Sequence, residues 1–101
     1  MKTEQRNELL LQALETERGG VQIYTTAIKC AVNEDLKKEW TEYLEQTTKH
    51  VEIVEGVFDE LGLDKEAETP GRMIVRHIGE SLVQAMEMAL EAGDPKAPEL
   101  V

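Results

Sequence analysis

Hydrophobic residues recur at helical spacing along three long stretches of this chain, and this periodicity restricts its fold more than any other feature. In residues 3–32 they fall within one stripe about 100° wide when successive residues are placed ~100° apart. That stripe comprises Leu10, Leu14, Val21, Tyr24, Ile28, Ala31 and Val32. Helix-favouring residues are plentiful, whereas the chain has only one Trp, two Tyr and one Phe. We therefore predict an all-α fold.

A second helix is predicted to follow after a very short turn and to end near residue 61. The turn, residues 33–35, reads Asn-Glu-Asp and has good N-cap chemistry, and Gly62 is a typical helix terminator. The apolar stripe of this helix comprises Leu36, Trp40, Tyr43, Thr47, His50, Val54, Val57, Phe58 and Leu61. Because the connection is so short, the first two helices should pack antiparallel as a hairpin.

A third helix is predicted over residues 70–92, because Thr69-Pro70 has the chemistry of a helix start and a glycine follows at residue 93. The residues expected to be buried on it are Ile74, Ile78, Leu82, Ala85 and Ala89. Further along, Pro98-Glu99 resembles the first turn of another helix. Two interpretations stay open here: a frayed tail, or the start of a fourth helix in a chain that is a fragment.

The length of 101 residues indicates a single domain, residues 1–101. Three wide apolar stripes leave more hydrophobic surface than a monomer of this size covers, so we expect self-association, at least as a dimer. The net charge of -10 argues against nucleic acid and anionic membranes as partners. No apolar run approaches the ~20 residues that span a bilayer, the N-terminus is not a signal peptide, and one cysteine allows no internal disulfide framework. A cytoplasmic location is therefore expected.

One carboxylate, that of Glu17, falls near the centre of the apolar stripe of residues 3–32. In an antiparallel hairpin that turns at Glu34, this residue lies level with about Val51, next to His50. A buried carboxylate needs a partner, since desolvation of a lone charge is costly. The two side chains can form a hydrogen-bonded structural pair, or they can coordinate a metal ion such as iron, manganese or zinc.

These residues resemble a pattern of the ferritin-like superfamily, which includes the rubrerythrins and the encapsulated ferritins. The likeness consists of a core glutamate, Glu17, a tyrosine seven residues later, Tyr24, and a histidine on the next antiparallel helix, His50. It implies half of a four-helix bundle, with metal ligands from a glutamate on one helix and a Glu-x-x-His motif on the other. By position, Glu17 and His50 would be metal ligands, with Tyr24 beside them.

The second motif is degenerate, because Thr47 stands where the family pattern has a glutamate, in "EQTTKH". That glutamate bridges two metals, which a threonine hydroxyl cannot do; the neighbouring Gln46 is at best a neutral ligand. The resemblance implies binding of iron or manganese at Glu17 and His50, with Tyr24, Gln46 and Thr47 around them, and ferroxidase-type chemistry if the protein is an enzyme. A symmetric second chain or a fourth helix would have to complete the site. The alternative is a non-catalytic ferritin-like helical module in which Glu17 and His50 form a buried structural pair.

Overall fold

The computed structural model describes residues 2–92, and all regular secondary structure in that part of the chain is helical. Helix α1 comprises Thr3–Cys30, α2 comprises Glu34–Leu61 and α3 comprises Pro70–Glu91. The predicted all-α fold is confirmed, although α1 ends two residues and α3 one residue earlier than predicted. None of these helices is long and apolar enough to cross a bilayer. Pro98-Glu99, predicted as a frayed tail or a new helix, lies outside the described residues.

The predicted capping residues act at the helix ends. The Asn33 side chain accepts hydrogen bonds from the backbone N–H groups of Asp35 and Leu36, at 2.8 and 3.2 Å. Gly62 ends α2 in the left-handed conformation, with φ of 69°. The Thr69 hydroxyl accepts from the N–H of Arg72 at 3.1 Å, directly before the proline that opens α3. Local chemistry therefore explains where each of these helices begins or ends.

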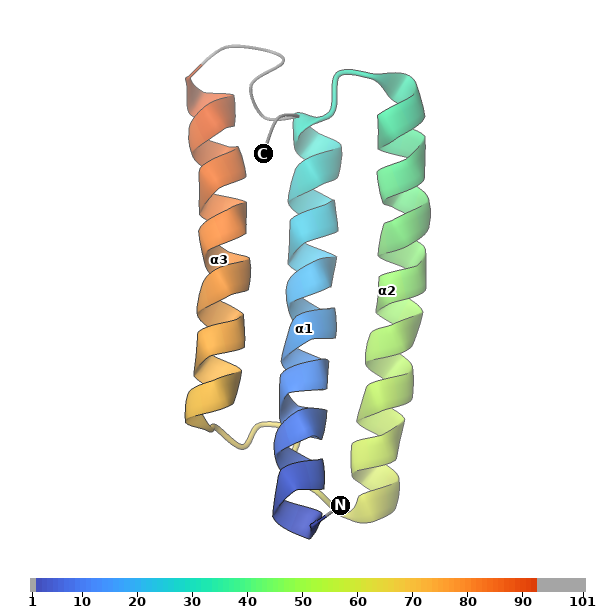
Figure 1. The fold of residues 1–101 in the computed structure, drawn as a ribbon. Helices are drawn as coiled ribbons and strands as arrows, with labels where there is room; N and C mark the ends of the chain where they lie inside the picture. Colours follow the sequence, from blue (N-terminus) through green and yellow to red (C-terminus); the bar gives the residue numbers. More distant parts are fainter. Residues whose placement is uncertain (1, 93–101) are drawn as a thin grey trace.

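The three helices form a single open layer with α1 in the middle (Figure 1). Helix α1 packs against both α2 and α3, whereas α2 and α3 make no contact with each other within residues 2–92. Helix α2 runs antiparallel to α1, and α3 runs in the same direction as α1. Residues 62–69 connect α2 to α3 by crossing behind α1 in Figure 1. We call that side of the layer the loop face, and the side turned toward the viewer the open face.

The small hydrophobic core lies where the connection crosses the layer. Leu11, Leu14 and Phe58 are buried together, and Leu63 and Ala67 from the connection pack against them. Leu14 and Phe58 are essentially inaccessible to solvent. The connection therefore acts as a third element over the α1–α2 contact on the loop face.

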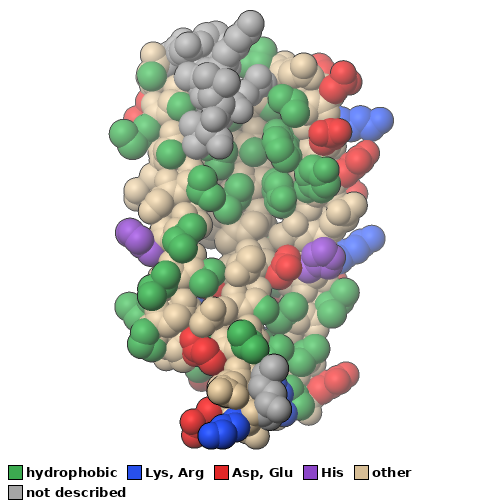
Figure 2. All heavy atoms as spheres, in the orientation of Figure 1, with side chains coloured by type: hydrophobic (Ala, Val, Ile, Leu, Met, Phe, Trp, Pro, Cys, Tyr) green, Lys and Arg blue, Asp and Glu red, His purple; other side chains and the backbone are tan. Residues whose placement is uncertain are grey.

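The predicted burial of α3 is wrong for its large side chains. Ile74, Ile78 and Leu82 are 62%, 58% and 41% exposed, and the buried residues of α3 are Arg72 and Met86. The physical reason is that α3 has one helical neighbour, α1, and turns toward it a different side from its most apolar one. Figure 2 shows hydrophobic side chains over all three helices on the open face.

The adjacent glycines of α1 face different helices. A Cβ atom on Gly20 would lie 3.0 Å from Cγ2 of Thr47 on α2, which is closer than ordinary packing. On the other side, a Cβ atom on Gly79 of α3 would lie 3.9 Å from the Cα atom of Gly19. The glycine pair therefore marks the level at which α1 comes close to both neighbours.

Candidate functional site

Helices α1 and α2 bring Glu17 and His50 together on the open face, as the hairpin register predicts. Nδ1 of His50 lies 3.5 Å from Oε2 of Glu17. The short connection fixes this pairing, because α1 ends at Cys30 and α2 begins at Glu34, which leaves little slack for one helix to slide along the other. The two candidate ligands are thus 33 residues apart in the sequence and adjacent in space.

Neither side chain is in a core, which corrects the expectation from the apolar stripes. The His50 side chain is 56% exposed and that of Glu17 is 29% exposed. Both residues lie at the edge of the α1–α2 contact, where the described residues place no further layer above them. The buried carboxylate of α1 is instead that of Glu15, two residues earlier, at 8% exposure.

A groove of about 410 Å³ surrounds the Glu17–His50 pair. Its lining includes Tyr24, Gln46 and Thr47, the three residues expected near the ligands. Above them, the rings of Tyr24, Trp40 and Tyr43 pack on one another, with centroids 5.7 to 5.9 Å apart. One end of the groove is therefore aromatic, and the other carries the carboxylate and the imidazole.

The groove offers two ionisable donors. Within residues 2–92 there is no group of three or more His, Cys, Asp or Glu side chains that could hold a metal ion. Thr47, at the place of the bridging glutamate, is buried against α1. The described residues therefore do not fit a two-metal centre; the donors that they bring together here are the Glu17 carboxylate and the His50 imidazole.

A second charged cluster, which the sequence did not predict, lies on the loop face around Glu15. Arg72 is 1% exposed and donates from Nε to Oε1 of Glu15 at 2.8 Å. Its Nη1 donates to the carbonyl oxygens of Lys65 and Ala67, at 2.6 and 3.0 Å. Arg72 thereby joins α1, α3 and the connection between α2 and α3. The pattern of apolar residues gives no signal for it, because a buried arginine interrupts that pattern.

Arg76 adds a second guanidinium to the same carboxylate. Its Nη2 donates to Glu15 at 3.0 Å and to Glu68 of the connection at 2.7 Å. Burial alone raises the pKa of Glu15, but the hydrogen bonds from Arg72 and Arg76 outweigh it, so the pKa lies below its usual value. Glu15 is therefore ionised at neutral pH.

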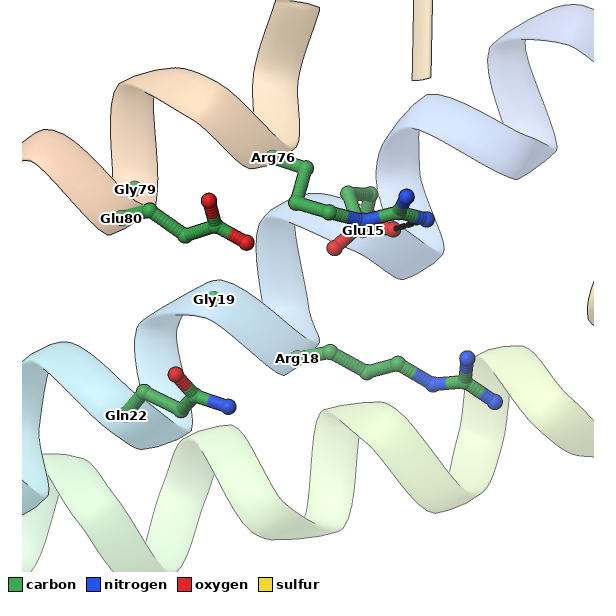
Figure 3. A pocket seen from close by; sticks show the side chains of 7 residues that line it. All are labelled: Glu15, Arg18, Gly19, Gln22, Arg76, Gly79 and Glu80. Atoms are coloured by element: carbon green, nitrogen blue, oxygen red, sulfur yellow. Dashed lines mark hydrogen bonds and ion pairs between the residues drawn. The ribbon is translucent and has the colours of Figure 1, made fainter. Parts of the chain in front are cut away.

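A pocket of about 180 Å³ lies beside this cluster, between α1 and α3 (Figure 3). Figure 3 shows the Arg76 side chain reaching toward Glu15, while Arg18 extends toward α2. Arg18 donates to Glu55 of α2 at 3.2 Å and to Glu66 of the connection at 2.8 Å. The guanidinium groups of Arg18 and Arg76 are each paired with two carboxylates. We therefore interpret the residues around this pocket as structural contacts between the helices and the connection.

No family model matches this chain, and the searches of curated proteins and of solved structures found no match either.

Proposed function

We propose that this chain is a ferritin-like metal-binding protein that holds one iron or manganese ion between Glu17 and His50. The spacing of the two donor atoms supports this. Two atoms that each lie about 2.1 Å from one metal ion are about 3.0 Å apart at the 90° angle of an octahedral iron or manganese site, and about 3.4 Å apart at a tetrahedral angle. Nδ1 of His50 and Oε2 of Glu17 are 3.5 Å apart. A good direct hydrogen bond would be shorter, at about 2.9 Å.

The chemistry of the donors is consistent with such an ion. Imidazole nitrogen and carboxylate oxygen together suit iron, manganese and zinc, and the resemblance to ferritin-like proteins favours the first two. A net charge of -10 raises the local concentration of cations around the whole protein. Water or donors from a partner chain could complete the coordination of such an ion, because the Glu17 and His50 side chains are partly exposed in the groove.

We propose binding of a single ion and not two-metal ferroxidase chemistry. A bridging carboxylate gives one oxygen to each of two metals, and Thr47 has no carboxylate to offer. Gln46, also in the groove, is a neutral donor. Glu17 supplies the negative charge that neutralises part of the cation, and His50 the neutral nitrogen ligand.

A second candidate function is favoured by the open face. In this alternative the chain is a non-catalytic helical association module, and a partner covers the Glu17–His50 pair. The observation behind it is that several large hydrophobic residues are exposed, among them Tyr43 at 42% and Ile53 at 65% exposure. Such side chains on a soluble protein mark interaction surfaces when they are contiguous.

The test is Mn(II) binding measured by the loss of the free-ion EPR signal, together with anaerobic Fe(II) binding by calorimetry. Glu17→Gln and His50→Ala should each weaken binding by about tenfold or more. The matched control is His77→Ala, which removes the other histidine of the chain from an exposed position on α3. Because Glu17 and His50 are partly exposed, these variants should remain folded. A wild-type protein that binds neither ion, or a control that loses binding equally, would overturn the metal site.

A further inference from the structure

Helix α3 has two rows of residues at heptad spacing but only one helical neighbour. The first row faces α1: Arg72 contacts Glu15, Gly79 lies at Gly19, and the carbonyl oxygen of Met86 lies 3.8 Å from Sγ of Cys30. The second, which we call the outer row, comprises Val75, Ile78, Leu82, Ala85 and Ala89. Its spacing of 3, 4, 3 and 4 residues is that of a helix–helix seam.

Ile78 and Leu82 of the outer row are exposed, whereas Val75, Ala85 and Ala89 are half-buried. Ile78 and Leu82 are 58% and 41% exposed, and the adjoining Ile74 is 62% exposed. Within residues 2–92, α3 has no contact with α2, so no second helix covers the exposed side chains of this row. A seam of this kind is the surface that another helix covers in a bundle.

The distribution of charge indicates which kind of partner fits. Two copies of a chain of net charge -10 associate with the least repulsion across a surface that is free of acidic side chains, because distant charges are screened by salt. The acidic residues of α3, Glu80, Glu87 and Glu91, lie roughly opposite the outer row, about 160–180° around the helix. The outer row thus has no charge to attract a basic or an acidic partner and no charge to repel a second copy.

We propose that the outer row of α3 packs antiparallel against the outer row of α3 in a second copy of this chain, about a two-fold axis at Leu82. The sizes of the side chains specify this direction. Val75 and Ile78 are large and lie before Leu82, whereas Ala85 and Ala89 are small and lie after it. Antiparallel packing places large residues against small ones, which fills the seam evenly. Parallel packing would set isoleucine on isoleucine and alanine on alanine.

One helix row does not by itself supply the ~800 Å² per partner of a stable interface. The hydrophobic side chains that Figure 2 shows over α1 and α2 on the open face extend the same surface. Tyr43 of α2, which lines the groove beside His50, is 42% exposed. Exposed hydrophobic surface is therefore available to extend the contact beyond α3.

This association does not depend on metal binding at Glu17 and His50. Gly79 lies against Gly19, so Leu82 is level with about Gln22, five residues beyond Glu17. At ~1.5 Å per residue, the two Glu17–His50 pairs of a dimer lie on either side of the axis, about 15 Å apart along the helices. The dimer can therefore form when the metal site is absent. An experiment that refutes metal binding would leave the α3 seam standing, and the reverse also holds.

Cysteine cross-linking tests both the seam and its direction. In a Cys30→Ala background, which leaves no other thiol in the chain, Leu82→Cys should form disulfide-linked dimers under mild oxidation. Ile78→Cys should not link to itself, but it should link to Ala85→Cys when the two variants are mixed. Gln84→Cys, on another side of α3, is the control. Self-linkage of all outer-row variants would indicate parallel packing, and equal linkage of the control would refute the seam.

Sedimentation of the unmodified chain gives an independent measurement. We expect a dimer at micromolar concentration in metal-free buffer, and Leu82→Glu should raise its dissociation constant about tenfold or more, because the seam would bury a charge. Gln84→Glu adds the same charge outside the seam and should leave the dimer intact. A wild-type chain that sediments as a monomer at these concentrations, with or without metal, would overturn the proposal.

Discussion

Replacing Arg72 by methionine tests how the layer is held together on the loop face. Methionine keeps most of the volume of the side chain and removes its guanidinium. The substitution deletes the 2.8 Å bond to Glu15 and the bonds to the carbonyl oxygens of Lys65 and Ala67. It leaves the Glu15 carboxylate, 8% exposed, with the single donor Arg76.

The size of the effect follows from the burial of these groups. Breaking a buried ion pair by removing one partner costs about 3–5 kcal/mol. The two carbonyl oxygens lie in half-buried residues, so each one left without this donor adds about 1 kcal/mol at most, because water can replace the donor. The remaining contact between Glu15 and Arg76 offsets part of the loss. We therefore expect Arg72→Met to lower the free energy of unfolding by about 3–4 kcal/mol, a large part of the stability of a domain this small.

Urea unfolding followed by circular dichroism at 222 nm measures this difference. Arg76→Met is the matched control: the same change four residues later, at a side chain that is 36% exposed, should have a far smaller effect. If the free energy of unfolding of Arg72→Met lies within about 1 kcal/mol of the wild-type value, as is typical of surface substitutions, the hydrogen bonds of Arg72 do not stabilise the layer. Equal losses for both variants would contradict the assignment of Arg72 as the central donor.

Three further outcomes are expected. Gly19→Ala should raise the melting temperature, because alanine favours a helix over glycine and the new Cβ atom would meet nothing within 4 Å. Gly20→Ala should raise it only when it is combined with Thr47→Ser, because that change removes the methyl group 3.0 Å from the new Cβ atom. Glu15 has a lowered pKa, so its contribution to stability is present at neutral pH and is lost as the pH falls below the usual glutamate value of 4.5 and through the lowered pKa; urea unfolding of Glu15→Gln should show a weaker acid dependence. Burial raises the pKa of the Cys30 thiol, so its reaction with a disulfide reagent should be slow in the native state and fast in urea.

Features set by local chemistry could be predicted from the sequence. The N-cap residues Asn33 and Thr69 and the terminator Gly62 act through their own side chain or backbone conformation, so a few neighbouring residues decide them. The adjacency of Glu17 and His50 also follows from the chain, because a short turn between antiparallel helices leaves only one register.

The burial of α3 and of Glu15 could not be predicted in the same way. Periodicity locates an apolar stripe but does not say which element covers it, and α3 meets α1 along Arg72 and Gly79 instead of along Ile78. Helix α1 lies between two neighbours and buries two sides, so one stripe could not describe it. The side toward α3 includes Glu15, which is stable there only because α3 supplies two arginines.

The most direct test of the metal site is an NMR titration of the histidine rings with Mn(II). The chain has two histidines, His50 and His77, so their ring signals can be assigned with one variant. We expect substoichiometric Mn(II) to broaden the signals of His50 selectively, because its Nδ1 lies beside the Glu17 carboxylate, and to leave those of His77 sharp. Equal broadening of both rings, or none at either, would contradict binding of a metal ion between Glu17 and His50.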